Sequence, residues 1–237
     1  MTSWIRRLHV WLGLLAGLQF LLWMGSGLVM SLLDAEQVHG AATRAPAPAA
    51  RPWIAGALAP GVVLASQRGA VDMLATGWLG ERPVYRLARG KTAWLVDARD
   101  GRAVTVDAAL AVRLAQASYQ GAWQATPARL VQASEEVRDH AGSVWRVDVQ
   151  DAEDTSVYVS AATGDILAHR NRSWRVFDLA WMLHIMDYSG RKDFNHPLVI
   201  VSAVLGVLLV LGGVWLLVVS LLARRRASSY GSPTALE

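Results

Sequence analysis

Two long apolar segments near the ends of the chain dominate its pattern of hydrophobic and polar positions. Residues 8–33 and 197–222 contain no Asp, Glu, Lys or Arg. A helix needs about 20 apolar residues to cross the hydrocarbon core of a bilayer. Both segments therefore predict transmembrane helices. The first is longer than the apolar core of a cleaved signal peptide, about 7–15 residues, so an anchor is favoured over a signal peptide.

Charged residues divide into basic tails and a neutral centre. Residues 34–193 carry 18 acidic and 18 basic side chains, whereas arginines lie next to the two apolar segments on the terminal sides, at Arg6, Arg7, Arg224, Arg225 and Arg226. Short basic segments stay in the cytoplasm. We therefore expect a bacterial inner-membrane protein with both termini cytoplasmic and its centre in the periplasm. The pI of 9.8 is then a topology signal, and no nucleic-acid partner is expected.

Residues 34–60 have the composition of a linker. This stretch is rich in alanine and contains four prolines, at Pro46, Pro48, Pro52 and Pro60. Proline at this density favours extended backbone over helix. The pattern predicts a stalk between the first membrane helix and a folded domain.

Two later stretches alternate apolar and polar residues with a period of two. The first contains strand candidates at 84–88 and 92–97 and a turn at Gly101, and the second contains candidates at 144–149 and 155–160 and a turn at Gly164. This alternation indicates half-buried antiparallel strands. The first strands are 60 positions apart and the turn glycines 63, so the second hairpin loop is expected to be about three residues longer.

A helix candidate precedes each strand set, at 61–70 and at 106–118, where Asp107 is the expected cap. This defines one repeat over 61–105 and a second over 106–170. The predicted fold class is a membrane-anchored α+β protein, in which two transmembrane helices flank an extracytoplasmic domain of two helix and antiparallel-strand repeats.

Residues 173–188 predict a further, amphipathic helix that begins at Ser173 as its cap. One face carries Phe177, Trp181, His184 and Tyr188, and Asp178 and Asp187 lie on other sides. At this length the helix is too short to span a bilayer. It is expected to lie at the outer membrane interface, where aromatic side chains are enriched.

Several short motifs resemble those of one family. The helix and strand repeats close with turns such as Thr163-Gly164-Asp-Ile, the first apolar helix opens with Arg6-Arg-Leu-His-Val-Trp-Leu-Gly-Leu, and Trp181-Met-Leu-His precedes the last helix. Together they resemble the PepSY domain and the PepSY-associated transmembrane family, as a small two-span member. The resemblance implies a role beside siderophore-iron reduction, known for some larger relatives, or peptidase inhibition or sensing.

Four histidines are the candidate cofactor-binding residues: His9, His39, His184 and His196. His9 lies at the cytoplasmic end of the first helix, where it is either part of a helix-packing face or an iron ligand of a bound haem b. The other three are expected on the outward side, about 26 residues of helix away from His9. They are candidates for haem axial ligands, with His184 and His196 also candidates for a transition-metal site. The alternatives are an interface anchor for His184 and a helix cap for His196.

The remaining charged residues and histidines are not expected to form a functional site. Arg170, Arg172 and Arg175 are expected to meet lipid headgroups. Glu135 and Glu136 are expected to be solvated, and His140 and His169 are weak site candidates. The chain has no cysteine, no phosphate-binding glycine loop and no metalloprotease or hydrolase motif, so no catalytic residue is identified.

Two functions of different class remain open. The first is support of membrane electron transfer, haem-linked and directed to iron or siderophore reduction, with a partner subunit. The second is a non-enzymatic, membrane-anchored module that binds a peptide or partner, as in peptidase inhibition or sensing. The expected partners are the lipid bilayer and either a membrane protein or a second copy. Small surfaces for a helix contact are present at Gly13, Gly17, Gly206 and Gly213.

Overall fold

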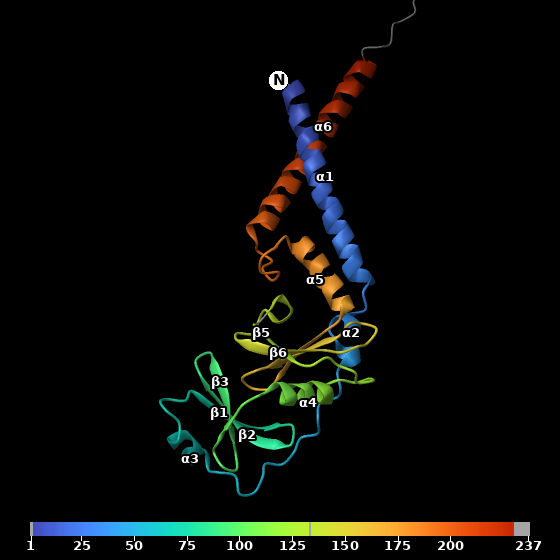
Figure 1. Ribbon diagram of the computed structural model, residues 1–237. Helices are drawn as coiled ribbons and strands as arrows, with labels where there is room; N and C mark the ends of the chain where they lie inside the picture. Colours follow the sequence, from blue (N-terminus) through green and yellow to red (C-terminus); the bar gives the residue numbers. More distant parts are fainter. Residues whose placement is uncertain (1, 133, 230–237) are drawn as a thin grey trace, which may run out of the picture. The chain divides into compact units, whose positions relative to one another are not determined.

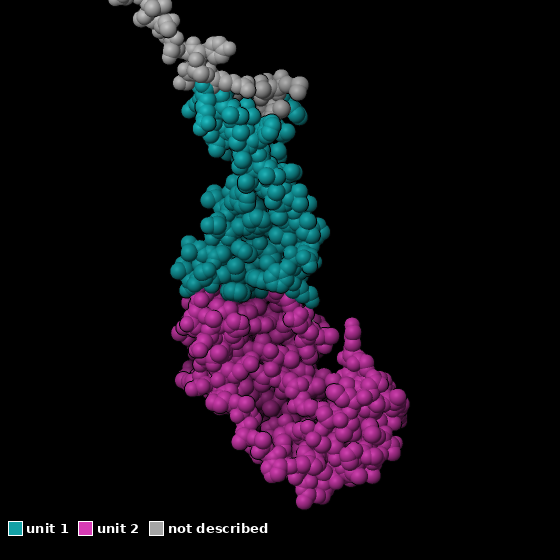
Figure 2. Space-filling model, turned by 180° about the vertical axis from the view of Figure 1, so that it is seen from behind, with its two compact units in different colours: residues 1–32, 177–237 teal, residues 33–176 magenta. Residues whose placement is uncertain are grey.

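The computed structural model describes residues 2–132 and 134–229 as an α+β protein with two compact units. Unit 1 combines the chain up to Leu32 with the chain from Phe177 onward, and unit 2 is Leu33–Val176. Figure 2 distinguishes the two units by colour. Each unit has its own internal packing.

Unit 1 is built from two long helices, α1 (Thr2–Leu32) and α6 (Pro197–Ser229), which pack against each other (Figure 1). Each is long and apolar enough to cross a membrane, over Arg7–Leu32 and Pro197–Arg225. Gly206 of α6 lies against the ring of Phe20, because a Cβ added there would sit 3.2 Å from Phe20. At Gly13, Gly17 and Gly213 nothing lies within 4 Å of such a Cβ, and the contact of these glycines with a second copy or a partner stays a prediction.

The predicted amphipathic helix is α5, Arg172–Ile185. Its first turn is capped by Asn171, whose Oδ1 accepts a hydrogen bond from the Trp174 N–H at 2.7 Å, so the expected Ser173 cap is wrong. The helix ends at Ile185, and Tyr188 therefore lies beyond it. Ser173 has the residue type of a cap, but the more buried Asn171 occupies the position.

The loop after α5 folds back on the helix in unit 1. Trp181 stacks with Phe177 at a ring distance of 6.2 Å and meets Phe194 edge-on at 5.0 Å. Asp178, expected on a polar side of the helix, is buried and bonded to Arg191 at 2.6 Å. Asp187 accepts bonds from several backbone N–H groups, chiefly those of Gly190 and Lys192, which lower its pKa well below the usual range.

Unit 2 contains two four-stranded antiparallel sheets, each with its strands in sequence order. The first sheet follows α3 (Pro60–Ala65) and consists of β1 (Met73–Leu79), β2 (Arg82–Arg89), β3 (Thr92–Asp97) and β4 (Ala103–Val104). The second follows α4 (Ala108–Ser118) and consists of β5 (Arg129–Gln132), β6 (Ser143–Asp148), β7 (Ser156–Ser160) and β8 (Ile166–Arg170). The expected hairpins are confirmed as β2–β3 and β6–β7, whereas β1 and β5 were not predicted.

The β2–β3 and β6–β7 hairpins correspond in their strand registers. Val84 lies opposite Asp97, and Val144 lies opposite Ser160. The first strands are thus offset by 60 residues and the second by 63, which confirms the three extra residues in the second hairpin. The turn glycines Gly101 and Gly164 have φ of 73° and 70°, a left-handed conformation that suits glycine.

Both sheets share one hydrophobic core. Leu79, Val84 and Leu95 from the first sheet pack in the same cluster as Val147, Val157 and Val159 from the second. Ala111 and Ala115 of α4 complete it, and the Asp107 side chain accepts from the Leu110 N–H at 2.7 Å, so the expected cap is confirmed. Because the core is shared, neither sheet is an independent domain.

The proline-rich stretch 34–60, predicted to be a stalk, is hydrogen-bonded to the rest of unit 2 at several points. It begins with α2 (Ala35–Val38) and a 3₁₀ turn, η1 (Ala41–Thr43). The Ala45 N–H donates to the Ser118 carbonyl and the Leu58 N–H to the Ala98 carbonyl, both at 2.8 Å. Extended backbone leaves its N–H and C=O groups available, and here the domain surface supplies partners for several of them.

Candidate functional site

A cavity of about 420 Å³ lies between α1 and α6 in unit 1, and we call it the α1–α6 groove. Its lining is leucine-rich, with four polar groups: the imidazole of His9, the amide of Gln19, the indole of Trp23 and the hydroxyl of Ser202. The spacing of its α1 residues places them on one helix face, at steps of three and four. The remaining lining residues are Leu8, Leu12, Leu15, Ala16, Leu18, Phe20, Leu22, Leu205, Leu208 and Leu209.

His9 is the predicted ligand residue that faces this groove. It lies beside Gly212 of α6, where an added Cβ would sit 3.8 Å from its Nδ1. His9 therefore packs at a helix contact and also lines a cavity, and its role as a ligand stays a prediction.

His184, a residue of α5, contacts α1 near the end of that helix that is farther from His9. Its Nδ1 is 3.1 Å from the Ser26 hydroxyl, and its ring covers Gly27. Ser26 follows His9 by 17 residues, a rise of about 26 Å along the helix. His9 and His184 therefore cannot bind the same iron within one copy of the chain.

His39 and His196 each hold a local backbone partner. His39 is the C-cap of α2, and its Nδ1 is 2.6 Å from the Ala35 carbonyl oxygen. His196 directly precedes α6, where its carbonyl accepts from the Val199 N–H at 3.0 Å and its Nδ1 from the Leu198 N–H at 3.4 Å. Over residues 2–132 and 134–229, no group of three or more His, Asp or Glu side chains is placed to hold a metal ion.

A haem with two axial histidines thus does not fit between His9 and His184 of one chain. The groove offers one imidazole, from His9, and its described lining contains no Lys or Arg for the two propionates of a haem. A haem in the groove would need a second ligand and cationic groups from another chain.

His169, expected to be a weak candidate, is buried in unit 2. Its Nδ1 lies 3.3 Å from the Thr43 hydroxyl and its Nε2 3.0 Å from the Ser118 hydroxyl. The ring also stacks on Tyr119 at 6.4 Å. Burial, with a smaller contribution from Arg44, lowers the pKa of His169 to about 4. The residue is therefore a neutral structural link between three segments.

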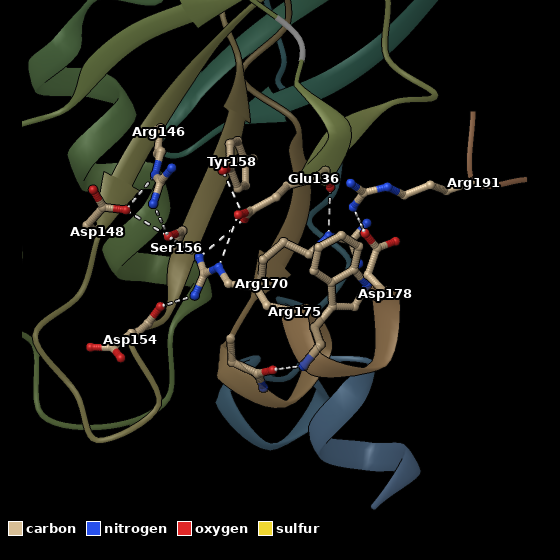
Figure 3. A network of polar contacts seen from close by, with 12 residues as sticks. Glu136, Arg146, Asp148, Asp154, Ser156, Tyr158, Arg170, Arg175, Asp178 and Arg191 are labelled. Carbon is tan, nitrogen blue, oxygen red and sulfur yellow. Dashed lines mark hydrogen bonds and ion pairs between the residues drawn. The ribbon is translucent and has the colours of Figure 1, made fainter. Parts of the chain in front are cut away.

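Glu136 is the largest correction among the charged groups, because it is the acceptor at the centre of a network rather than solvated surface (Figure 3). The Tyr158 hydroxyl donates to its carboxylate at 3.0 Å, and the Arg175 guanidinium donates at 3.1 and 3.3 Å. Burial, and then the negative charge of Glu136, raise the pKa of Tyr158 to about 12. The network joins the start of α5 to β7 and to the short 3₁₀ turn η2 (Glu135–Val137).

The arginines expected at lipid headgroups are bonded within unit 2. Arg170 donates to the Glu136 carbonyl at 2.7 Å and lies 4.1 Å over the Trp174 ring. Arg172 pairs with Asp154 at 2.6 Å. The acidic partners of Arg172 and Arg175 lie 18 and 39 residues away and are not visible from local sequence, and contact of these arginines with lipid headgroups stays a prediction.

A polar cavity of about 530 Å³ lies beside this network, lined by Thr126, Arg146, Asp148, Val149, Gln150, Asp151, Asp154, Ser156 and Arg175. Its charges are already paired. Arg146 Nε lies 2.6 Å from Asp148, and the Ser156 hydroxyl donates to the same carboxylate at 2.7 Å. Asp151 accepts from the Tyr119 hydroxyl at 2.9 Å. This internal pairing indicates a structural role and leaves little charge for a ligand.

Replacing Glu136 by Gln is expected to lower the stability of unit 2 by about 2 kcal/mol, because Arg175 and the Tyr158 hydroxyl lose a charged acceptor. For a domain of this size, that corresponds to a fall of about 5 °C in the unfolding temperature of the full chain in detergent. Glu81→Gln is the matched control, since Glu81 pairs with Arg51 on the surface and is 88% exposed. Equal shifts for the two variants would show that the network adds nothing.

Comparison of the chain with protein-family models, with curated proteins and with solved structures finds no match. Its activity is therefore inferred from its own residues. Sequence reasoning found His9 but missed Gln19 and Trp23, which share the groove with it. One signal was present, because Gln19 is the only side-chain amide between residues 8 and 33.

Proposed function

We propose that the chain is a membrane-anchored subunit that supports electron transfer together with a partner protein, and that it holds a redox ligand in the α1–α6 groove. The observation that carries the proposal is the groove itself. It is an apolar cavity between two helices of membrane-spanning length, and its lining carries His9, Gln19 and Trp23 at successive positions along α1. Apolar cavities with a few convergent polar groups are the usual form of a small-molecule site.

The proposed topology follows the charge pattern. Arg7 lies at the start of the α1 span, and Arg224 and Arg225 end the α6 span. Basic flanks favour the cytoplasmic side, which assigns unit 2 to the periplasm of a bacterial inner membrane. The resemblance to PepSY-associated membrane proteins supports this arrangement and an iron or siderophore as the final acceptor.

The partner is expected to supply the cofactor ligand that one copy of the chain lacks. If a haem is bound, His9 is the groove residue that would hold it, and the haem would supply a one-electron carrier. The second ligand would come from a second copy or from a membrane partner. The open surfaces at Gly13 and Gly17 are available for such a contact, since small residues let membrane helices approach closely.

The test is to purify the full chain in a mild detergent and to titrate it electrochemically while recording its absorption spectrum. We expect a reducible group that copurifies or that can be loaded from haem or quinone. His9→Ala is expected to lower its occupancy about tenfold, equivalent to about 1.4 kcal/mol of binding free energy. His39→Ala is the matched control, because His39 lies in unit 2 at the end of α2.

Absence of any reducible group, after expression and loading with ample haem and quinone, would contradict electron transfer. That outcome would favour a second candidate, a non-enzymatic module that binds a partner polypeptide. The specific observation for it is β1, a seven-residue strand at the edge of the first sheet with no charged residue. Natural edge strands are commonly protected by charge, and an unprotected edge can accept an added strand.

A further inference from the structure

We propose that the α1–α6 groove binds a quinone, a neutral and lipid-soluble molecule whose carbonyl oxygens accept hydrogen bonds from Gln19 and Trp23. The inference rests on the proposed function, because it names the redox ligand of the same groove. Three properties of the groove lead to it: unpaired donors, neutral walls, and a size and aromatic surface that suit a flat ring.

The first property is a pair of donors without acceptors. The Gln19 Nε2 and the Trp23 Nε1 are both buried, and neither has a hydrogen-bond partner among the described residues. They are four residues apart on α1 and so lie on one helix face, and both residues line the groove. Buried donors are nearly always paired in folded proteins, and more so in a membrane, where water is absent. Two adjacent exceptions indicate a ligand that presents acceptors.

The second property is the absence of charge. The groove lining drawn from the described residues contains no Asp, Glu, Lys or Arg, and His9 is its one titratable side chain. An anionic ligand would therefore lack a cationic partner in a medium where unpaired charge is costly. This disfavours a haem, with its propionates, and a phospholipid phosphate.

The third property is a suitable size and surface for a flat ring. The volume of about 420 Å³ is within the range of small-molecule sites. Phe20 and Trp23 form an aromatic pair on the α1 side, with ring centres 5.9 Å apart. Ser202 adds a hydroxyl from α6. The apolar flanks of both helices allow a lipid-soluble ligand to enter from the bilayer.

The experiment uses the full chain in phosphatidylcholine nanodiscs and a short-tailed ubiquinone analogue as the probe. Affinity is measured by calorimetry, and an azido derivative of the probe maps the labelled residues by mass spectrometry. Gln19→Leu and Trp23→Phe each remove one donor and keep an apolar helix surface. Each is expected to weaken binding about fivefold, and the double variant more than tenfold. Trp215→Phe is the matched control, because Trp215 is exposed on α6 outside the groove, and it should bind as the unaltered chain does.

Labels on groove residues of α1 and α6, together with the loss in the double variant, would support the quinone. Unchanged affinity in the double variant, or labels elsewhere, would overturn it. A phospholipid that copurifies in the groove, a haem ligated by His9, or a second copy cross-linked through Gln19 or Trp23 would each overturn it as well. If haem rather than quinone occupies the groove, the quinone proposal is wrong but the proposed electron transfer is not contradicted. If quinone binds but no partner reduces it, the quinone site is supported and the proposed electron transfer is contradicted.

Discussion

Gly40→Ala is expected to be among the most damaging single substitutions in unit 2, with a loss of about 3 kcal/mol of folding free energy. Gly40 has φ of 69°, a left-handed conformation that costs any other residue about 1–2 kcal/mol. A Cβ at this position would also lie 2.6 Å from the carbonyl oxygen of His169 and 2.9 Å from its Cβ. Since one of these atoms is backbone, the chain around Gly40 would have to move away from β8.

The variant Gly80→Ala separates the cost of the left-handed backbone conformation from the cost of the close contact of the added Cβ. Gly80 has φ of 60°, but no atom lies within 4 Å of its added Cβ, so the expected loss is the conformational cost alone, about 1 kcal/mol. The measurement is the unfolding temperature of the full chain in detergent, supported by hydrogen exchange of the β8 amides. Similar losses for the two variants would mean that the contact between Gly40 and His169 relaxes freely, and would sink the prediction.

Local periodicity explains what could be predicted from the sequence. The two apolar helices, the β2–β3 and β6–β7 hairpins and the Asp107 cap are each encoded by neighbouring residues. The 60- and 63-residue offsets were also readable, because strand register follows from alternation and turn position. The strand β1 was missed because its sequence, Met-Leu-Ala-Thr-Gly-Trp-Leu, has an internal glycine and no clear alternation.

Contacts between distant segments explain what could not be predicted. Glu136 meets Arg175 across 39 positions, and Asn171 donates to the Gln37 carbonyl across 134. In the sequence, each of these residues is of a polar or charged type that is usually exposed at a protein surface. The candidate site shows the same limit: His9 stands out as a histidine in an apolar helix, but its cavity depends on how α1 packs on α6.

Unit 2 is expected to lose about 3 kcal/mol of stability as the pH falls from 6.5 to 4, because of His169. Burial lowers the pKa of this imidazole from 6.5 to about 4 in the folded chain. Below pH 6.5 the unfolded chain therefore binds a proton that the folded chain does not. Stability is complete above pH 6.5 and falls by about 1.4 kcal/mol for each pH unit until the folded imidazole also titrates.

The acidic groups of unit 2 affect its stability at lower pH than His169 does. Burial raises the pKa values of Asp148 and Asp151, but their hydrogen bonds together outweigh it and lower both values below 3.8, so the stability that these groups supply is lost mainly below pH 4. The interval between pH 4.5 and 6.5 consequently isolates the histidine. Over that interval, the slope of unfolding free energy against pH is the quantity to measure, by hydrogen exchange of the β7 and β8 amides in the full chain.

His169→Gln should remove that slope, because glutamine stays neutral while it still offers polar atoms to the hydroxyls of Thr43 and Ser118. The absolute stability of this variant is not the readout, since a repacked core changes stability at every pH equally. His140→Gln controls for the loss of a histidine as such from a loop of the same unit. A slope that survives in His169→Gln would assign the pH dependence to other groups, and the neutral, buried imidazole would then not be what links η1, α4 and β8.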